Sequence, residues 1–155
     1  MSGKLRIWVV TADGARAHLF VYDNSADRLR SAELTGLPAP EERLESHYEK
    51  SDRPGRAFAS SGGGVRHALE SHSDYRKLEK HKVAVAVAEA INLAAAAKEF
   101  DRLVLVAPPR SVGELRQYLS DQVQSEMVVI SKDLVKEPVA KIWEHVAAAV
   151  HRSLR

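Results

Sequence analysis

A chain of 155 residues, of which 45% are apolar, fits one ordinary globular domain with its own core. The formal net charge of +2 is too small for a general polyanion binder, so any contact with nucleic acid must depend on where charges cluster. Because the sequence contains no cysteine, disulfide bonds, thiol nucleophiles and zinc–thiolate sites are excluded.

The sequence carries no pattern of export or membrane insertion. The apolar run in the opening MSGKLRIWVVTADGARA is too short for a secretory signal and leads directly into a strand-like pattern. The Ala- and Val-rich stretch from Val83 to Ala97 is interrupted by Glu89 and Asn92, and it is shorter than the ~20 residues that cross a bilayer. We therefore expect a cytoplasmic protein.

Three antiparallel strands are predicted at the start of the chain. Leu5–Thr11 and Ala15–Tyr22 are rich in β-forming residues, and Ala12-Asp13-Gly14 between them is a hairpin signal. Both alternating sets of the second run contain apolar side chains, so both of its faces should be partly covered. After a turn at Asp23–Asp27, the third strand should extend over Leu29–Leu37.

Residues 38–74 lack a regular pattern and are expected to form a long mobile loop. Its second part, RPGRAFASSGGGVRHALE from Arg53 to Glu70, holds four glycines, three arginines and one histidine. In a helix or strand, Gly62-Gly63-Gly64 would provide no side-chain packing and would lose much backbone entropy. Since loops of this length are usually functional or disordered, the segment is a candidate binding element.

The remaining sequence alternates helices and strands. Strong helix formers extend from about Tyr75 to Phe100, and Leu103–Ala107 is a continuous apolar run, typical of a strand buried on both faces. The apolar stripe of this helix comprises Leu78, Val85, Ala88, Ile91 and Leu93. A Ser-x-x-Glu capping box at Ser111 and Glu114 should open a helix to about Val123.

The last two elements complete an α/β pattern. Met127–Ile130 should be a strand, and Glu137-Pro138 should start the final helix. One face of that helix carries Val139, Ile142, Trp143, Val146 and Val150, and both Trp8 and Trp143 are expected in the core. The order β-β-β-α-β-α-β-α predicts a single domain over residues 1–155. We expect a ribonuclease-H-like, mixed five-stranded sheet of order 3-2-1-4-5, with an antiparallel second strand and helices on both faces.

Three stretches resemble the bacterial host-attachment family, named for proteins required for attachment to host cells: WVVTADGARAHLF, DRPGRAFASSGGGVRHALE and FDRLVLVAPPRSVGELR. They occur in the family's order, and the resemblance covers nearly the whole chain. The family in turn resembles the middle domain of archaeal and eukaryotic class-1 peptide release factors. In those factors, the loop before the long helix carries Gly-Gly-Gln. The equivalent residues here, Ser61 to Arg66, include no glutamine, so the resemblance implies binding to RNA or the ribosome without peptide release.

The main candidate site is the Gly/Arg segment. Guanidinium groups pair with phosphate oxygens, and glycines allow backbone N–H groups to approach them. This candidate binding loop comprises Arg53, Pro54, Gly55, Arg56, Ser61, Gly62, Gly63, Gly64, Arg66 and His67. The alternative is a solvated loop whose arginines pair with the acidic segment Glu41–Glu49.

A secondary candidate anion site combines the start of the long helix with the turn after the fourth strand. Residues 53–82 contain seven Lys and Arg against three Asp and Glu, and cations near a helix N-terminus oppose its dipole, which favours a ligand there. A turn between a buried strand and a helix is a common binding position in open α/β sheets, although it is also an ordinary structural turn. The site comprises Arg76, Lys77, Lys80, Lys82, Arg110 and Ser111.

No metal, cofactor or catalytic site is predicted. His67, His72 and His81 match no ligand spacing. A two-metal nuclease needs converging carboxylates, whereas Asp13 follows the first strand and Asp101 precedes the fourth. A serine hydrolase is not supported either, because the serines of the loop have no identifiable base.

The expected function is therefore non-catalytic binding of structured RNA or the ribosome through the Gly/Arg loop. One alternative is a protein-interaction or regulatory factor that is required only indirectly for attachment to host cells. Another is a hydrolase that uses the loop as a lid.

Overall fold

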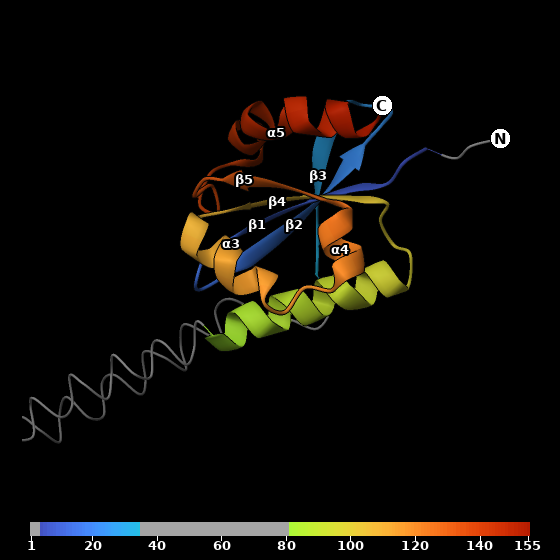
Figure 1. Cartoon of the computed structure of the whole chain (residues 1–155). Helices are drawn as coiled ribbons and strands as arrows, with labels where there is room; N and C mark the ends of the chain where they lie inside the picture. The colour runs from blue at the N-terminus through green and yellow to red at the C-terminus, as the bar shows by residue number, and fades with distance from the viewer. Residues whose placement is uncertain (1–3, 35–80) are drawn as a thin grey trace, which may run out of the picture.

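Five strands form one mixed sheet in the computed structural model, which describes residues 4–34 and 81–155. In chain order the strands are β1 (Ile7–Ala12), β2 (Ala17–Asp23), β3 (Arg28–Ala32), β4 (Arg102–Ala107) and β5 (Met127–Ser131). Across the sheet their order is β3-β2-β1-β4-β5, with β2 antiparallel to β1 and β3, and with β4 parallel to both β1 and β5. The predicted sheet order and the antiparallel second strand are confirmed (Figure 1).

The central strand β1 is buried along its whole length because it has a strand on each side and a helical layer on each face. Trp8 pairs with Val21 on β2 and with Leu103 on β4, which fixes the register of both ladders. Such a position requires a nearly continuous apolar sequence, and both β1 and β4 have one.

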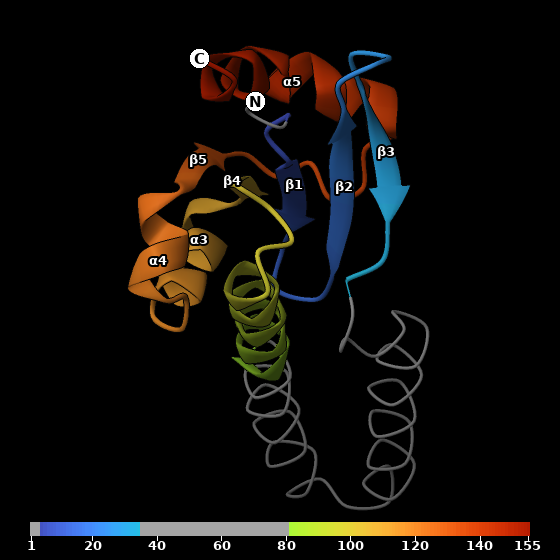
Figure 2. The ribbon, with the colours of Figure 1, turned by 90° about the vertical axis from the view of Figure 1, so that its right-hand side faces the viewer.

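Helices cover both faces of the sheet, as predicted (Figure 1 and Figure 2). One face carries α3 (Pro109–Arg116), α4 (Asp121–Ser125) and the helix over residues 81–96, and the other carries α5 (Val139–Ser153). Leu19 of β2 belongs to the core under the first layer, and Phe20 to the core under the second. The prediction that both faces of β2 are covered is therefore confirmed.

The third strand is shorter than predicted. The ladder between β2 and β3 ends at the pair Leu19–Ala32, and neither Glu33 nor Leu34 is part of the strand. Beyond the strand, Leu34 packs against the buried core. The predicted extension is wrong for these two residues, and residues 35–37 lie outside the described part.

The predicted capping box at Ser111 and Glu114 is wrong. α3 begins at Pro109 with Pro108 as its N-cap, and no side chain caps its first turn. Proline suits the first helical position because its φ is already helical and the N–H that it lacks would have no partner there. The last helix begins at Val139 with Pro138 as its N-cap, one residue after the predicted start at Glu137-Pro138.

The helix predicted from Ser111 to about Val123 is two helices. α3 ends at Arg116, and Ser120 then caps α4 by accepting a hydrogen bond at its Oγ from the N–H of Val123, at 3.2 Å. A serine hydroxyl competes for nearby backbone N–H groups and so favours a new helix start over continuation of the old helix.

Among the described residues of each predicted apolar stripe, one large side chain faces solvent. Leu93 is 72% exposed, whereas Ile91 is fully buried, because successive helical residues are about 100° apart and two positions therefore separate opposite faces. Val139 in the first turn of α5 is 42% exposed. Trp8 is buried as predicted, and Trp143 is half-buried against the core beneath α5.

Candidate functional site

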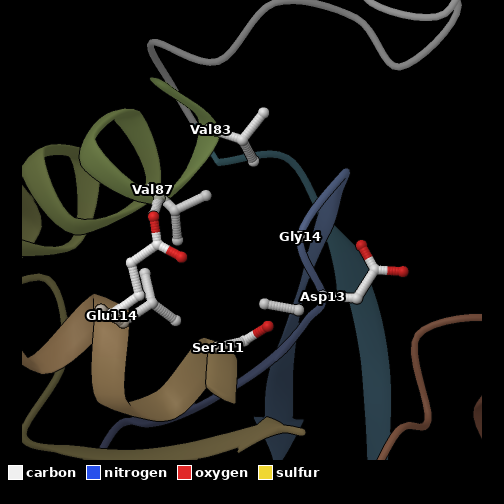
Figure 3. Close-up of a pocket in the computed structure, with 9 residues that line it drawn as sticks. Asp13, Gly14, Val83, Val87, Ser111 and Glu114 are labelled. Carbon is white, nitrogen blue, oxygen red and sulfur yellow. The ribbon is translucent and has the colours of Figure 1, made fainter. Parts of the chain in front are cut away.

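Strand ends and helix starts meet along one side of the sheet, which we call the carboxyl edge. Because β1 and β4 are parallel, the Asp13–Gly14 turn after β1 lies near the Pro108–Ser111 turn after β4. The helix over residues 81–96 also reaches the carboxyl edge, since its Val83 lines a recess there together with Gly14 and Ser111 (Figure 3). Open α/β sheets commonly bind ligands at such an edge.

The carboxyl edge also holds both points at which the described chain borders residues 35–80. β3 is antiparallel to β2 and so runs in the direction of β1, which brings Leu34 to this edge. His81, the first described residue after that segment, lies in a helix that reaches the same edge (Figure 2). Most predicted site residues lie outside the described residues: Arg53, Pro54, Gly55, Arg56, Ser61, Gly62, Gly63, Gly64, Arg66, His67, Arg76, Lys77 and Lys80.

The structure brings the other three predicted site residues to the carboxyl edge. Lys82 and Arg110 are exposed, and Ser111 is half-buried with its side chain at the recess. The first turn of α3 contains Arg110 and no acidic residue, and its first N–H groups have no intrahelical acceptor. Two cations and several polar donors therefore share this edge, which suits contact with phosphate oxygens.

The recess itself is small. Its free space is about 10 Å³, roughly what one water molecule requires, so it cannot hold a nucleotide or an organic cofactor. Apolar side chains form much of the lining, and polar groups complete it: Ala12, Asp13, Gly14, Val83, Ala84, Val87, Ser111, Glu114 and Leu115. As the described residues line it, this recess has room for a water-sized group only.

Asp13 is occupied by the hairpin turn. Its Oδ1 accepts hydrogen bonds from the backbone N–H groups of Ala15 and Arg16, at 2.7 and 2.9 Å. Its own N–H donates to the carbonyl oxygen of Arg16 at 3.0 Å. In Figure 3 the carboxylate points away from the Ser111 hydroxyl. Asp13 therefore stabilises the turn that borders the recess, as an Asx-type turn residue does.

The side chain of His81 links the helix over residues 81–96 to α3 and the turn after it. Its Nδ1 lies 3.6 Å from Glu114 Oε1, and the Tyr118 hydroxyl lies 3.4 Å from each of the ring nitrogens. The His81 and Tyr118 rings meet edge to face, with centroids 5.4 Å apart. A hydrolase at this edge would need a base within reach of Ser111. Among the described residues, His81 contacts Glu114 and Tyr118 and not that serine.

Asn92 joins the same helix to the turn between α3 and α4. Its Nδ2 donates to the carbonyl oxygen of Tyr118 at 2.8 Å, and its Oδ1 accepts from the N–H of Ser120 at 2.9 Å. The sequence offered a signal for this bridge, because a lone amide in the Val83–Ala97 stretch is unusual for an apolar packing face. In the sequence, Asn92 was interpreted only as a polar residue that interrupts an apolar stretch, so its bridging hydrogen bonds were not predicted.

The carboxylates expected to lie apart do so. Asp101 sits before β4, at the opposite end of the parallel strands from Asp13, and its Oδ2 accepts from Arg6 N at 2.7 Å and from Arg6 Nε at 3.3 Å. These hydrogen bonds, from the backbone N–H first and then the guanidinium, hold the pKa of Asp101 below its usual value. Within residues 4–34 and 81–155, no three His, Asp or Glu side chains gather as a metal site would require.

A second polar cluster, which sequence reasoning missed, lies at the opposite end of the sheet under α5. Asp27 Oδ1 accepts from the Tyr22 hydroxyl at 2.7 Å and lies 2.7 Å from His151 Nε2. The Tyr22 ring stacks on Trp143, with centroids 5.7 Å apart. The bond to Asp27, followed by burial, raises the pKa of Tyr22 to about 12. Sequence proximity across the β2–β3 hairpin could have suggested the Tyr22–Asp27 bond, but nothing local points to His151.

Comparison with known proteins gives one family. A family model described as "Protein required for attachment to host cells" matches residues 8–146, from β1 to within α5. The match includes the whole carboxyl edge and all the predicted site residues. A search of curated proteins found no match to the chain. In the part of the chain that the structure describes, no helix has both the length and the apolar character needed to cross a membrane.

Proposed function

We propose that this chain, which belongs to the family of proteins required for attachment to host cells, is a non-catalytic binding protein that contacts structured RNA or the ribosome. The contact surface is the carboxyl edge together with the Gly/Arg segment. The observation that carries the proposal is topological. Leu34 and His81, which border residues 35–80, lie at the edge where Lys82 and Arg110 are exposed.

Charge supports this surface over the rest of the molecule. Residues 53–82 hold seven Lys and Arg against three Asp and Glu, while the net charge of the whole chain is only +2. Such a concentration of cations on a nearly neutral protein favours one directed contact with an anionic polymer. The arginines of the segment add bidentate geometry, which suits phosphate oxygens better than a diffuse field does.

The shape of the edge supports a large partner. Its recess has room for about one water molecule, so binding energy for a small ligand would have to come from an open surface. A structured RNA presents many phosphates over a wide area and needs no deep pocket. The sequence resemblance of this family to release-factor middle domains, which no comparison shows, would imply the same class of partner, and the missing glutamine would favour binding without peptide release.

A protein-interaction or regulatory role is the second candidate. It is favoured by Leu93, which is 72% exposed on the helix over residues 81–96. A large apolar side chain in that position gains burial when a protein partner covers it.

A crosslinking pull-down from cells, performed with and without nuclease, tests the proposal. If the protein binds RNA, RNA should be recovered with it, and nuclease treatment should release any ribosomal proteins from it. Recovery of the same protein partner with and without nuclease, with no RNA attached, would contradict the RNA proposal and support the second candidate. Ala substitution of both Lys82 and Arg110 should reduce RNA recovery. Substitution of Arg28 and Arg152, which are exposed away from the carboxyl edge, should not.

A further inference from the structure

β5 is an edge strand that lacks the usual protection against pairing. It forms the outer margin of the sheet on the side opposite β3, and its sequence MVVIS contains no charge (Figure 2). All of its residues are at least partly exposed, and Val128 is 37% exposed. β3, the other edge strand, carries exposed Arg28 and Arg30. Charged side chains on an edge discourage further pairing, whereas an apolar edge invites it.

The hydrogen-bonding pattern identifies the backbone groups that face outward. Leu103 N donates to Glu126 O at 3.0 Å, which sets the phase of the β4–β5 ladder. In a parallel pair, alternate residues of a strand direct both N–H and C=O to the same neighbour. Val128 therefore faces β4, and Met127, Val129 and Ser131 face away from it. No described residue forms a hydrogen bond with the outward-facing groups.

We propose that β5 pairs antiparallel with β5 of a second copy of this chain, around a two-fold axis at Val129. The five-stranded sheet then continues across the dimer. In this register Val129 lies opposite Val129 of the second copy, and Met127 lies opposite its Ser131. The outward N–H and C=O groups on both strands become partners, which is the hydrogen-bonded pair geometry of an antiparallel ladder. This inference is independent of the proposed RNA contact.

Charge complementarity selects both this partner and this register. Glu126 and Lys132 flank β5 on its two sides. With Val129 on the axis, Glu126 of one copy lies opposite Lys132 of the other, and the symmetry repeats the pair at the second end. Keeping the outward groups in register requires shifts of two residues. Such a shift would place Glu126 opposite Ile130 or Leu134 and lose both pairs.

The side chains on the α5 face also fit. Strand alternation puts Val128 and Ile130 on this face, and Lys132, just after the strand, has its Nζ 3.1 Å from Nδ1 of His145 on α5. Pairing covers the exposed Val128 with Ile130 of the second copy, and β-branched cross-strand neighbours of this kind stabilise sheets. Opposite charges at the ends add to this, and like charges there would oppose pairing.

Sedimentation of the full chain over a wide concentration range tests the proposal with charge reversals. An edge contact buries less area than a standard interface, so measurements should extend to about 1 mM protein. We expect a dimer whose dissociation constant rises about tenfold or more in E126K and in K132E, because each change replaces two attractions by two repulsions. The double variant E126K/K132E restores opposite charges and should return close to the parent. The matched control E33K, at an exposed residue just after β3, should leave association unchanged.

A backbone variant tests the pairing independently. Proline at Val129 removes only an outward-facing N–H, so Val129→Pro should leave the β4 ladder intact and abolish the dimer. Circular dichroism checks that this variant folds. If it does not fold, the charge-reversal variants alone test whether β5 forms the dimer contact. A parent chain that stays monomeric throughout the range would overturn the proposal. So would a dimer that the single reversals leave unchanged, or one that the double variant fails to restore.

Discussion

His151 Nε2, near the end of α5, lies 2.7 Å from Asp27 Oδ1 in the turn between β2 and β3. The same oxygen accepts the Tyr22 hydroxyl, so this carboxylate joins the β2–β3 hairpin to a residue 124 positions beyond Asp27 in the chain. Asp27 has a φ of 52°, a left-handed conformation that short polar residues tolerate better than most. This contact fixes the last helix to the sheet at the end opposite the carboxyl edge.

The first prediction concerns alkaline stability. The pKa of Tyr22 is raised to about 12, so between the ordinary tyrosine pKa and 12 the folded state keeps a proton that the unfolded state loses. Tyr22 therefore stabilises the fold below that interval, and its contribution is lost as pH rises through it. Denaturant unfolding at several pH values should show this loss in the parent and not in Tyr22→Phe. Ultraviolet titration should assign the late tyrosine to Tyr22.

The second prediction concerns the stability of the fold in acid. The hydrogen bond with His151, and then the one from Tyr22, lowers the pKa of Asp27, so the folded state binds this proton less readily than the unfolded chain does. The contribution of Asp27 is present above the ordinary aspartate pKa and disappears as pH falls through the lowered value. Asp27→Asn keeps a residue that tolerates positive φ. It should be less stable than the parent at neutral pH, and the difference should shrink in acid.

A control and a contrary outcome define this second test. Asp133→Asn, at an exposed aspartate, should leave the free energy of unfolding at neutral pH within about 0.5 kcal/mol of the parent. If the difference between Asp27→Asn and the parent stayed constant down to strong acid, the carboxylate would not be the stabilising group.

The third prediction concerns the Asn92 bridge. Asn92→Ala leaves the carbonyl of Tyr118 and the N–H of Ser120 without their side-chain partner. The bond to the Tyr118 carbonyl is partly buried and the bond from Ser120 is exposed, so the expected loss is about 1–2 kcal/mol in the free energy of unfolding. Urea denaturation measures it, with Glu89→Ala on the exposed face of the same helix as control. An unchanged midpoint would show that water replaces both bonds at no cost.

The fourth prediction separates two apolar residues that lie near each other in sequence. Ile91 is fully buried and Leu93 is 72% exposed. Ile91→Ala should lower the free energy of unfolding by about 2–5 kcal/mol because it removes packed core atoms. Leu93→Ala should change it by less than about 0.5 kcal/mol. A large loss in the Leu93 variant would mean that another surface covers this side chain.

The sheet could be predicted because its signals are local. The continuous apolar runs of β1 and β4 and the turn after β1 define the strands, and the alternation of elements then restricts the order. Leu93 was wrongly predicted to lie on the buried stripe because it is apolar, although it is two positions after Ile91 and therefore lies on the opposite face of the helix. The α3 start was misplaced because two signals competed, and Pro109 overrode the capping pattern at Ser111.

The site was less predictable than the fold. Lys82, Arg110 and Ser111 come together because parallel strands deliver their ends to one edge, and this follows from topology once the strand order is known. The contacts of His81 with Glu114 and of His151 with Asp27 depend on how separate elements pack. No periodicity or spacing in the sequence encodes such distances.

The fifth prediction tests the central claim, that an anionic polymer binds at the carboxyl edge and the Gly/Arg segment. The measurement is the affinity for a structured RNA as a function of salt concentration. Each charge-assisted contact from Arg53, Arg56 and Arg66 should contribute about 1–2 kcal/mol before screening, so the triple Ala variant should lose on the order of tenfold or more in affinity. Its plot of log K against log salt should also be flatter, because fewer counterions are released, and its melting temperature should not change. Equal affinity and an equal salt slope in the parent and the triple variant would contradict the account.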